Sequence, residues 1–319
     1  MSRLHESTGL GPIVNFIRRA TRLLLMIGAV WISVGTRAAS AQPANDPTAS
    51  CANCITSCTK IAKAGFYEVD SDLYAAATPG SDCLVITAPN VVLNLNTHTI
   101  SGNTDADGIH VKPTASGVFI EGEGATIEKF GEGIEIDAAN ALVDNFTVTA
   151  NSDAGVLLNR AQRADISLFS STGNLTDGVR IVQGAQNLLQ SGTITGNDRY
   201  GVWIDGASHN SVGNFDVESN GMGGIYIGCS QAGPGRPCIG RVPESNYNYV
   251  FSGKVVNPNG GSQSYGVTID LHDNYNRVVN VEASDNLKFN LYDVNPDCAG
   301  NSWFAEISIW NVQPSGCIK

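Results

Sequence analysis

Gly178-Val179-Arg180-Ile181, Gly201-Val202-Trp203-Ile204 and Gly224-Ile225-Tyr226-Ile227 are three copies of one short pattern, spaced 23 residues apart. The pattern is a glycine followed by an apolar, a variable and an apolar residue. It also begins at Gly108, Gly133, Gly155 and Gly266, and Asn290 begins a degenerate last copy. The successive steps are 25, 22, 23, 23, 23, 42 and 24 residues. A fixed repeat of this length indicates a solenoid, in which each repeat is one structural unit stacked on the next.

A column of asparagines supports the register. One asparagine lies four residues before the start of most copies, and asparagine tolerates the left-handed backbone of tight turns. Asparagine side chains stacked at equivalent turns can form a hydrogen-bonded ladder. We therefore expect one corner of successive coils at Asn151, Asn174, Asn197, Asn220 and Asn286.

Further strand signals lie between the glycines, as in Phe146-Thr147-Val148 and Phe215-Asp216-Val217. Alternation of apolar and polar residues is typical of a half-buried strand. We predict an all-β protein, a right-handed parallel β-helix (a solenoid of single coils) with turns about 4.8 Å apart and disulfide-rich end caps. A leucine-rich solenoid has a similar period, but the chain lacks its leucine spacing. A β-sandwich would show no fixed 23-residue register.

The first 41 residues are expected to be a signal peptide. A basic start with Arg18, Arg19 and Arg22 precedes an apolar run of 12 residues, 23–34, and Ala39-Ser40-Ala41 fits a cleavage site. The rival interpretation is an uncleaved anchor, but 12 residues are too few to span a bilayer. We expect a secreted or periplasmic protein whose mature chain does not insert into a membrane.

Eight cysteines in an exported chain favour disulfides. We divide the chain into the signal peptide (1–41), an N-terminal cap with the first coil (42–90), a β-helix (91–295) with a loop insertion (228–248), and a C-terminal cap (296–319). The spacing of the first three cysteines would also suit a metal or iron–sulfur site, and the sequence leaves the disulfide connectivity open. The cysteines are Cys51, Cys54, Cys58, Cys83, Cys229, Cys238, Cys298 and Cys317.

The charge of the chain argues against general nucleic-acid binding. Residues 1–41 hold five Arg and one Glu, so 14 basic and 29 acidic residues remain after cleavage, a net charge of −15. Such a chain repels a phosphate backbone outside a local basic patch. We expect a monomer.

The segment Asp82–Gly102, DCLVITAPNVVLNLNTHTISG, resembles the opening coil of bacterial right-handed β-helix repeat proteins. Together with the repeats, the resemblance covers roughly residues 60–310. It implies a pectin-lyase-like fold, which is shared by uronate lyases, mannuronan C5-epimerases, glycoside hydrolases and NosD-like periplasmic proteins. One fold hosts many activities, so the resemblance specifies the fold more than the reaction.

No catalytic motif of these families is complete in the chain. Asn174-Leu175-Thr176-Asp177-Gly178 loosely resembles the first acidic motif of polygalacturonases, but their paired aspartates and Gly-His-Gly are absent. The Asp-Pro-His motif of the epimerases is absent too. No aspartate cluster typical of pectate lyases supports Ca²⁺, so we expect no cofactor and assign no metal ligands.

Strand alternation predicts which side chains point away from the core. The middle residue of each triplet forms one outward column, and the residue two positions later forms a second column beside it. The first column contains His110, Glu135, Arg180, Trp203, Tyr226 and Tyr292, and the second contains Lys112, Asp137, Asp205 and Asp270. Most outward charges only keep a solenoid soluble, and we expect this of His110.

The two columns nevertheless suggest a carbohydrate site. Exposed aromatic rings can stack on sugars, arginine binds carboxylates through two donors, and paired carboxyl groups can catalyse glycoside hydrolysis. An arginine with a base could instead remove a proton beside a uronate carboxylate. We predict catalytic roles for Glu135, Arg180, Asp205, Asp270 and His272, and substrate binding by Asp137, Trp203 and Tyr226.

The leading hypothesis is a polysaccharide-binding or -modifying protein that holds an extended glycan along the strand face. If it is an enzyme, it would be a uronate lyase, a C5-epimerase or a glycosidase. The alternative is a non-catalytic envelope or surface module, or a NosD-like accessory protein. Regular turns without a complete catalytic motif favour that alternative.

Overall fold

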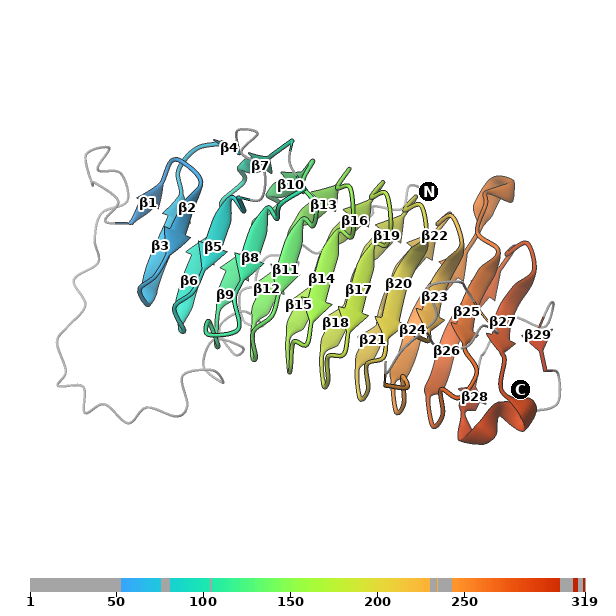
Figure 1. Cartoon of the computed structure of the whole chain (residues 1–319). Coiled ribbons are helices and arrows are strands. Elements are labelled where there is room, and N and C mark those ends of the chain that lie inside the picture. The colour runs from blue at the N-terminus through green and yellow to red at the C-terminus, as the bar shows by residue number, and fades with distance from the viewer. Residues whose placement is uncertain are drawn as a thin grey trace, which may run out of the picture. The chain divides into compact units, whose positions relative to one another are not determined.

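The computed structural model describes residues 53–75, 81–103, 105–229, 234, 243–304, 312–314 and 318. Within them the chain forms 29 short strands and two 3₁₀ helices, and every strand pairing is parallel. The strands stack turn upon turn into a β-solenoid (Figure 1). The signal peptide, Cys51, Cys238, Cys317 and most of the 228–248 insertion lie outside the described residues.

The repeating triplets form one continuous sheet, here called the first sheet. Neighbouring strands of this sheet come from successive coils, as Figure 1 shows for β8 to β23. Its 11 strands are β2 (Thr59–Ile61), β5 (Leu84–Ile86), β8 (Ile109–Val111), β11 (Ile134–Ile136), β14 (Val156–Asn159), β17 (Val179–Val182), β20 (Tyr200–Asp205), β23 (Gly223–Ile227), β25 (Tyr265–Ile269), β27 (Phe289–Asp293) and β29 (Val312–Gln313).

The remaining strands form a second sheet with two ladders, which the eight-residue strands β24 and β26 join. Its strands are β1 (Cys54–Ile55), β3 (Gly65–Val69), β4 (Leu73–Tyr74), β6 (Val91–Asn94), β7 (Thr99–Ser101), β9 (Phe119–Glu121), β10 (Thr126–Glu128), β12 (Leu142–Asp144), β13 (Thr147–Thr149), β15 (Asp165–Ser167), β16 (Ser170–Thr172), β18 (Leu188–Gln190), β19 (Thr193–Thr195), β21 (Ser211–Gly213), β22 (Asp216–Glu218), β24 (Tyr249–Val256), β26 (Arg277–Ser284) and β28 (Ser302–Phe304). The helices are η1 (Pro258–Gly260) and η2 (Pro296–Gly300).

The core runs along the inside of the stack. The apolar residues on both sides of each variable position are almost completely buried, as the alternation predicts; Ile134, Ile136, Val202 and Ile204 are all 0% exposed. The glycine before each triplet lies at a close approach. A Cβ atom on Gly201 would come within 2.5 Å of the Val217 side chain and 2.8 Å of the Gly224 carbonyl oxygen. Glycine is therefore required where one coil bends against the next.

The predicted asparagine ladder is confirmed. Asn151 donates from Nδ2 to Oδ1 of Asn174 at 3.0 Å, Asn174 to Asn197 at 2.8 Å, and Asn197 to Asn220 at 2.9 Å. Gln263 continues the ladder and donates to Asn286 at 2.7 Å. These side chains satisfy buried polar groups at a corner of the solenoid, where no strand pairing is available to them.

A second ladder, which the sequence analysis missed, lies at another corner. Asn187 donates to Asn210 at 3.0 Å, Asn210 to Asn248 at 3.1 Å, and Asn248 to Asn276 at 3.1 Å. The backbone N–H of Asn276 donates to Asn301 at 2.7 Å. The sequence spacings of this ladder are uneven because it crosses the loop insertion, which explains why a fixed period did not find it.

Disulfides are present at the N-terminal end. Cys58 and Cys83 form one across 25 residues, between the coils of β2 and β5. Cys54, Cys229 and Cys298 are also disulfide-bonded. The disulfide interpretation of these cysteines is thus confirmed over a metal or iron–sulfur site. The division into caps and body stays a prediction, although strand pairing already begins at β1. Of the helices in the described part of the chain, neither is long and apolar enough to cross a membrane.

Candidate functional site

The first sheet brings the predicted outward column into one row. His110 pairs with Glu135, Glu135 with Leu157, and Leu157 with Arg180 on neighbouring strands. The register continues through Trp203 and Tyr226. Residues more than 100 positions apart in the sequence therefore share one face of the solenoid, and their polar members form two clusters.

The first cluster, here called the His110 cluster, consists of His110 with the charged residues around it. His110 is only 7% exposed, so the expectation that it is ordinary surface is wrong. Its Nε2 lies 2.9 Å from Oδ2 of Asp137, and its Nδ1 lies 2.7 Å from Oδ2 of Asp107. Lys112 Nζ lies 2.6 Å from Nδ1. The remaining members are Asp82 and Glu135, each 3.2 Å from Nδ1, and Glu132, which is hydrogen-bonded to Asp107.

The carboxylates hold His110 in its cationic form. Burial by itself would lower the pKa of His110, but hydrogen bonds to Asp107 and Asp137 and the charge of Glu135 outweigh it and raise this pKa to about 9. The doubly protonated ring donates from Nδ1 to Asp107 and from Nε2 to Asp137. Burial opposes ionisation of Asp107, yet its hydrogen bonds to His110 and Glu135 lower the pKa of that carboxyl group overall.

In contrast to Asp107, two glutamates of the cluster have a raised pKa. Burial, followed by the hydrogen bond to Asp107, raises the pKa of Glu135 to about 7. Burial and the charge of Asp107 raise the pKa of Glu132 to about 8. The cluster therefore contains a protonated carboxyl group and an ionised one next to each other at neutral pH, which is an arrangement found at acid/base centres.

The same residues offer ligand atoms for a cation. Asp82, Asp107 and His110 present one set of atoms that lie within 4.8 Å of one another, and His110, Glu135 and Asp137 present a second. These carboxylate oxygens, together with the imidazole once His110 has lost a proton, would suit Mn²⁺ or Zn²⁺ by their chemistry. Lys112, 3.2 Å from Asp82, already places one positive charge against these carboxylates.

Arg180 and Asp205 form the second cluster. They lie on β17 and β20, two and three strands beyond β11 in the first sheet. Nη2 of Arg180 donates to Oδ2 of Asp205 at 2.5 Å, so the structure brings together two residues that the sequence analysis selected. Asp205 is 6% exposed, and burial raises the pKa of its carboxyl group in spite of the arginine. Arg199 directly precedes β20, and its Cζ atom lies 4.6 Å from the centroid of the Trp203 ring.

The expectation that Trp203 and Tyr226 are exposed sugar-binding rings is wrong, because both are 0% exposed. Their rings pack together with Tyr200, whose centroid lies 4.6 Å from that of Tyr226. Nε1 of Trp203 donates to the carbonyl of Gly228 at 2.6 Å. Alternation correctly places these rings outside the solenoid core, but it does not reveal what covers them.

Asp270 and His272 do not form the predicted surface pair. Strand β25 ends at Ile269, so the alternation on which the prediction rests stops before either residue. Asp270 is 1% exposed and accepts a hydrogen bond from the Tyr226 hydroxyl. His272 is exposed, has a left-handed backbone (φ 71°), and donates its N–H to Asn295.

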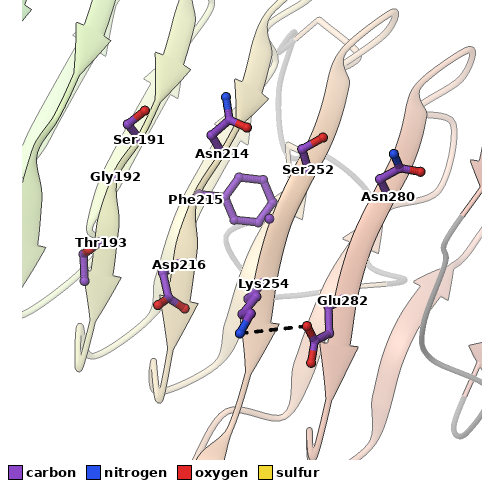
Figure 2. A pocket seen from close by; sticks show the side chains of 11 residues that line it. Ser191, Gly192, Thr193, Asn214, Phe215, Asp216, Ser252, Lys254, Asn280 and Glu282 are labelled. Atoms are coloured by element: carbon purple, nitrogen blue, oxygen red, sulfur yellow. Dashed lines mark ion pairs between the residues drawn. The ribbon is translucent and has the colours of Figure 1, made fainter. Parts of the chain in front are cut away.

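A polar depression lies on the second sheet, away from both clusters. Figure 2 shows Phe215 in its centre, with residues from β19, β22, β24 and β26 around it. Phe215 fills the space left by Gly253, where a Cβ atom would come within 2.5 Å of the ring. Lys254 and Glu282 pair across the rim at 4.0 Å. Gly192 and Gly253 line the depression, and it holds no acid/base pair comparable to the His110 cluster.

A third column supplies the residues that the sequence analysis missed. It lies two positions before the first buried residue of each first-sheet triplet and passes through Asp82, Asp107, Glu132 and Asp177. The recurrence of an acidic residue at this position is a sequence signal from which these residues could have been predicted. Period-two alternation applies only inside and directly after each strand, so it makes no prediction for the residues that lead into the strand.

Comparisons with known proteins agree with this architecture. A family model described as "Right handed beta helix region" matches residues 85–283. No curated protein matches the sequence.

Several solved structures share the fold at low sequence identity. A mutant of the periplasmic alginate epimerase AlgG is 13% identical with a TM-score of 0.53, covering 73% of this chain and 64% of that one. The Dettilon tailspike protein is 11% identical with a TM-score of 0.51, covering 79% and 60%. The A-module of the Azotobacter vinelandii mannuronan C-5 epimerase AlgE6 is 13% identical with a TM-score of 0.43, covering 78% and 87%. The chain thus spans less than two thirds of the first two proteins, and the likeness to those two establishes the fold alone.

Proposed function

Since the chain belongs to the right-handed β-helix family, which places a row of side chains from successive coils on one face, we propose that it is a polysaccharide-modifying enzyme with its acid/base centre at the His110 cluster. One observation carries the proposal. Glu135, with a pKa of about 7, lies beside Asp107, whose pKa is lowered, on a strand face that can accept an extended polymer. Carboxyl groups with pKa values shifted in opposite directions are concentrated at functional sites.

Glycoside hydrolysis is the reaction that this pair of acids supports best. Glu135 is protonated up to about neutral pH and is 15% exposed at its side chain, so it can protonate a leaving glycosidic oxygen. Asp137 offers a carboxylate oxygen within 4.8 Å of the Glu135 oxygen. His110 donates to Oδ2 of Asp137 and fixes its orientation. A separation this short suits a nucleophilic carboxylate better than one that activates a water molecule.

Proton abstraction beside a uronate carboxylate is the second reaction class. It needs an unprotonated base near neutral pH, and a His110 with a pKa of about 9 carries its proton there. His110 is therefore not that base, and Glu135, protonated beside a carboxylate, supports hydrolysis better than lyase or epimerase chemistry. The proposal includes export, with the mature chain acting on an extended glycan outside the cytoplasm.

The test is proton NMR of glycans incubated with purified residues 42–319. The panel contains alginate, pectate, glycosaminoglycans and xylan. Hydrolysis predicts new reducing-end signals that Glu135→Gln reduces at least about 100-fold. Glu123→Gln, which changes an exposed carboxylate elsewhere, should leave the rate unchanged. Unsaturated or epimerised products would show that the site catalyses proton abstraction beside a uronate carboxylate instead of hydrolysis.

A panel that stays unmodified at all tested pH values would count against an enzyme. It would favour a non-catalytic surface module, which the burial of Trp203 and Tyr226 also suits, because no open aromatic platform is available at those two positions.

A further inference from the structure

We propose that Arg180 and Arg199 form a binding site for an anionic group, a carboxylate or a sulfate ester, on the glycan. The site would make the protein selective for acidic polysaccharides. That the anion belongs to a glycan rests on the function proposed above, whereas the binding of an anion rests on the arginines themselves.

Both guanidinium groups lie against one fixed ring. The Cζ atoms of Arg180 and Arg199 lie 4.1 and 4.6 Å from the centroid of Trp203. The indole cannot turn away, since it is fully buried and its Nε1 is bonded to the Gly228 carbonyl at 2.6 Å. Cation–π contact therefore orients two positive charges around a rigid side chain.

The arginines and two aspartates form one electrostatic group. Arg180 bonds to Asp205, and Nη1 of Arg199 lies 3.9 Å from Oδ2 of Asp177. The positive charge of each guanidinium also lowers the pKa of the carboxyl group in the other pair. The four charges balance one another, in a mature chain with a net charge of −15. An acidic polymer thus meets a neutral patch at this point, with arginine donors at its surface.

Hydrogen-bonding capacity remains unused in this group. Nε of Arg180 and Nη2 of Arg199 are buried, and neither has an acceptor within the described part of the chain. The buried hydroxyl of Tyr200, whose ring lies 5.8 Å from Arg199, is likewise without a partner there. Buried donors without acceptors are rare and costly. An incoming oxyanion would contact the exposed part of each guanidinium group, and guanidinium groups suit carboxylate and sulfate oxygens in particular.

The position fits a polymer that also reaches the acid/base centre. Arg180 lies on β17, two strands from Glu135 on β11, and the register is continuous through β14. Two strand spacings are about 10 Å. Both arginine side chains keep an exposed part, 19% for Arg180 and 25% for Arg199. A glycan that runs along the first sheet would therefore pass the arginines a short distance from the proposed point of cleavage.

The experiment measures binding separately from turnover. Calorimetry would use the full mature chain carrying Glu135→Gln, with hexasaccharides of galacturonate, methyl-esterified galacturonate, mannuronate, chondroitin sulfate and xylan. We expect the acidic probes to bind at least tenfold more tightly than the methyl ester and xylan. Adding Arg199→Gln should remove that preference, Arg199→Lys should retain part of it, and Arg163→Gln, an exposed arginine outside the two columns, should not change it.

A measurement on the unsubstituted chain guards against misfolded variants. The side-chain Nε–H NMR signals of Arg180 and Arg199 should shift on titration with an acidic probe and stay in place with the methyl ester. Acidic probes that bind no better than neutral ones, or equally well to Arg199→Gln, would overturn the anion site. If only neutral glycans are turned over, the acid/base centre is supported and the anion site is not. If acidic glycans bind through the arginines but are not turned over, the anion site is supported and the acid/base centre is not.

Discussion

At the scale of single residues, His110 shows how a solenoid builds a site. Its ring is surrounded by carboxylates from its own coil and from both neighbouring coils, since Asp82 belongs to the coil of β5, Asp107 to that of β8, and Glu135 to that of β11. One coil could not supply these groups because it contributes only a three-residue strand to the face. The chemistry of the site therefore depends on stacking.

The pKa of His110 tests this arrangement. Asp107→Asn removes the hydrogen bond that contributes most to raising this pKa. We expect it to fall from about 9 by at least ~1 unit towards the ordinary value near 6.5. Titration of the His110 Cε1–H signal by NMR measures it. Asp72→Asn, which removes the exposed partner of His98 instead, is the control, and an unchanged His110 titration in Asp107→Asn would contradict the assignment.

Glu132 gives a prediction for stability against pH. Its pKa is raised from 4.5 to about 8 in the folded chain, so the folded state holds a proton that the unfolded chain releases above about 4.5. The free energy of unfolding should therefore decrease as pH rises from about 4.5 to 8. Glu132→Gln mimics the protonated form and should remove on the order of 1–3 kcal/mol of this decrease.

Urea denaturation at pH 5 and pH 9 measures the effect. The variant and the unsubstituted chain should be similar at pH 5, and the variant should be more stable at pH 9. Equal stability differences at both pH values would argue that Glu132 does not titrate in this range. Glu123→Gln serves again as the exposed control.

At the scale of elements, the asparagine ladders connect coils where strand pairing is interrupted. Asn197 accepts at Oδ1 from the backbone and side chain of Asn174, at 3.0 and 2.8 Å, and donates to Asn220 and to the Ser171 carbonyl. It is 1% exposed. Each ladder member thus satisfies buried polar groups of the coils before and after it.

Asn197→Ala should destabilise the chain by about 2–4 kcal/mol, because it leaves several buried donors and acceptors unsatisfied. Chemical denaturation gives the change, with the exposed Asn103→Ala as a matched control expected to lie within about 0.5 kcal/mol of the parent. A cost below about 1 kcal/mol would mean that water replaces the ladder at little loss.

At the scale of the whole molecule, each coil contacts mainly its neighbours, so the ends of the stack are its weakest points. The Cys58–Cys83 disulfide links the first two coils of the first sheet and closes a stretch of 25 residues. A cross-link of that length limits the unfolded conformations of the terminal coils and keeps them on the stack.

Cys58→Ser/Cys83→Ser should cost about 3 kcal/mol, and the loss should be local. Hydrogen exchange would show faster exchange in β2 and β5 than in β14 and β17. Uniformly accelerated exchange along all coils would contradict independent fraying of this end.

The sequence by itself determined the architecture, because the fold repeats one local rule. A glycine before each triplet, apolar residues on both sides of a variable one, and an asparagine four residues earlier are enough to set the period, the buried face, the first asparagine ladder and the row from His110 to Tyr226. Each of these depends only on positions within a coil and on equal spacing between coils. The second asparagine ladder was not predicted, because its members are not evenly spaced in the sequence.

Only the tertiary structure decided which outward residues meet and which are covered. Asp82 and Asp107 contact His110, and Glu132 is hydrogen-bonded to Asp107, although all three residues lie just before their strands, outside the positions to which alternation was applied. Trp203 and Tyr226 point away from the core as predicted, yet they pack with Tyr200 and are buried. Direction along a strand is a local property that sequence encodes, whereas burial and convergence depend on every segment that packs against that face.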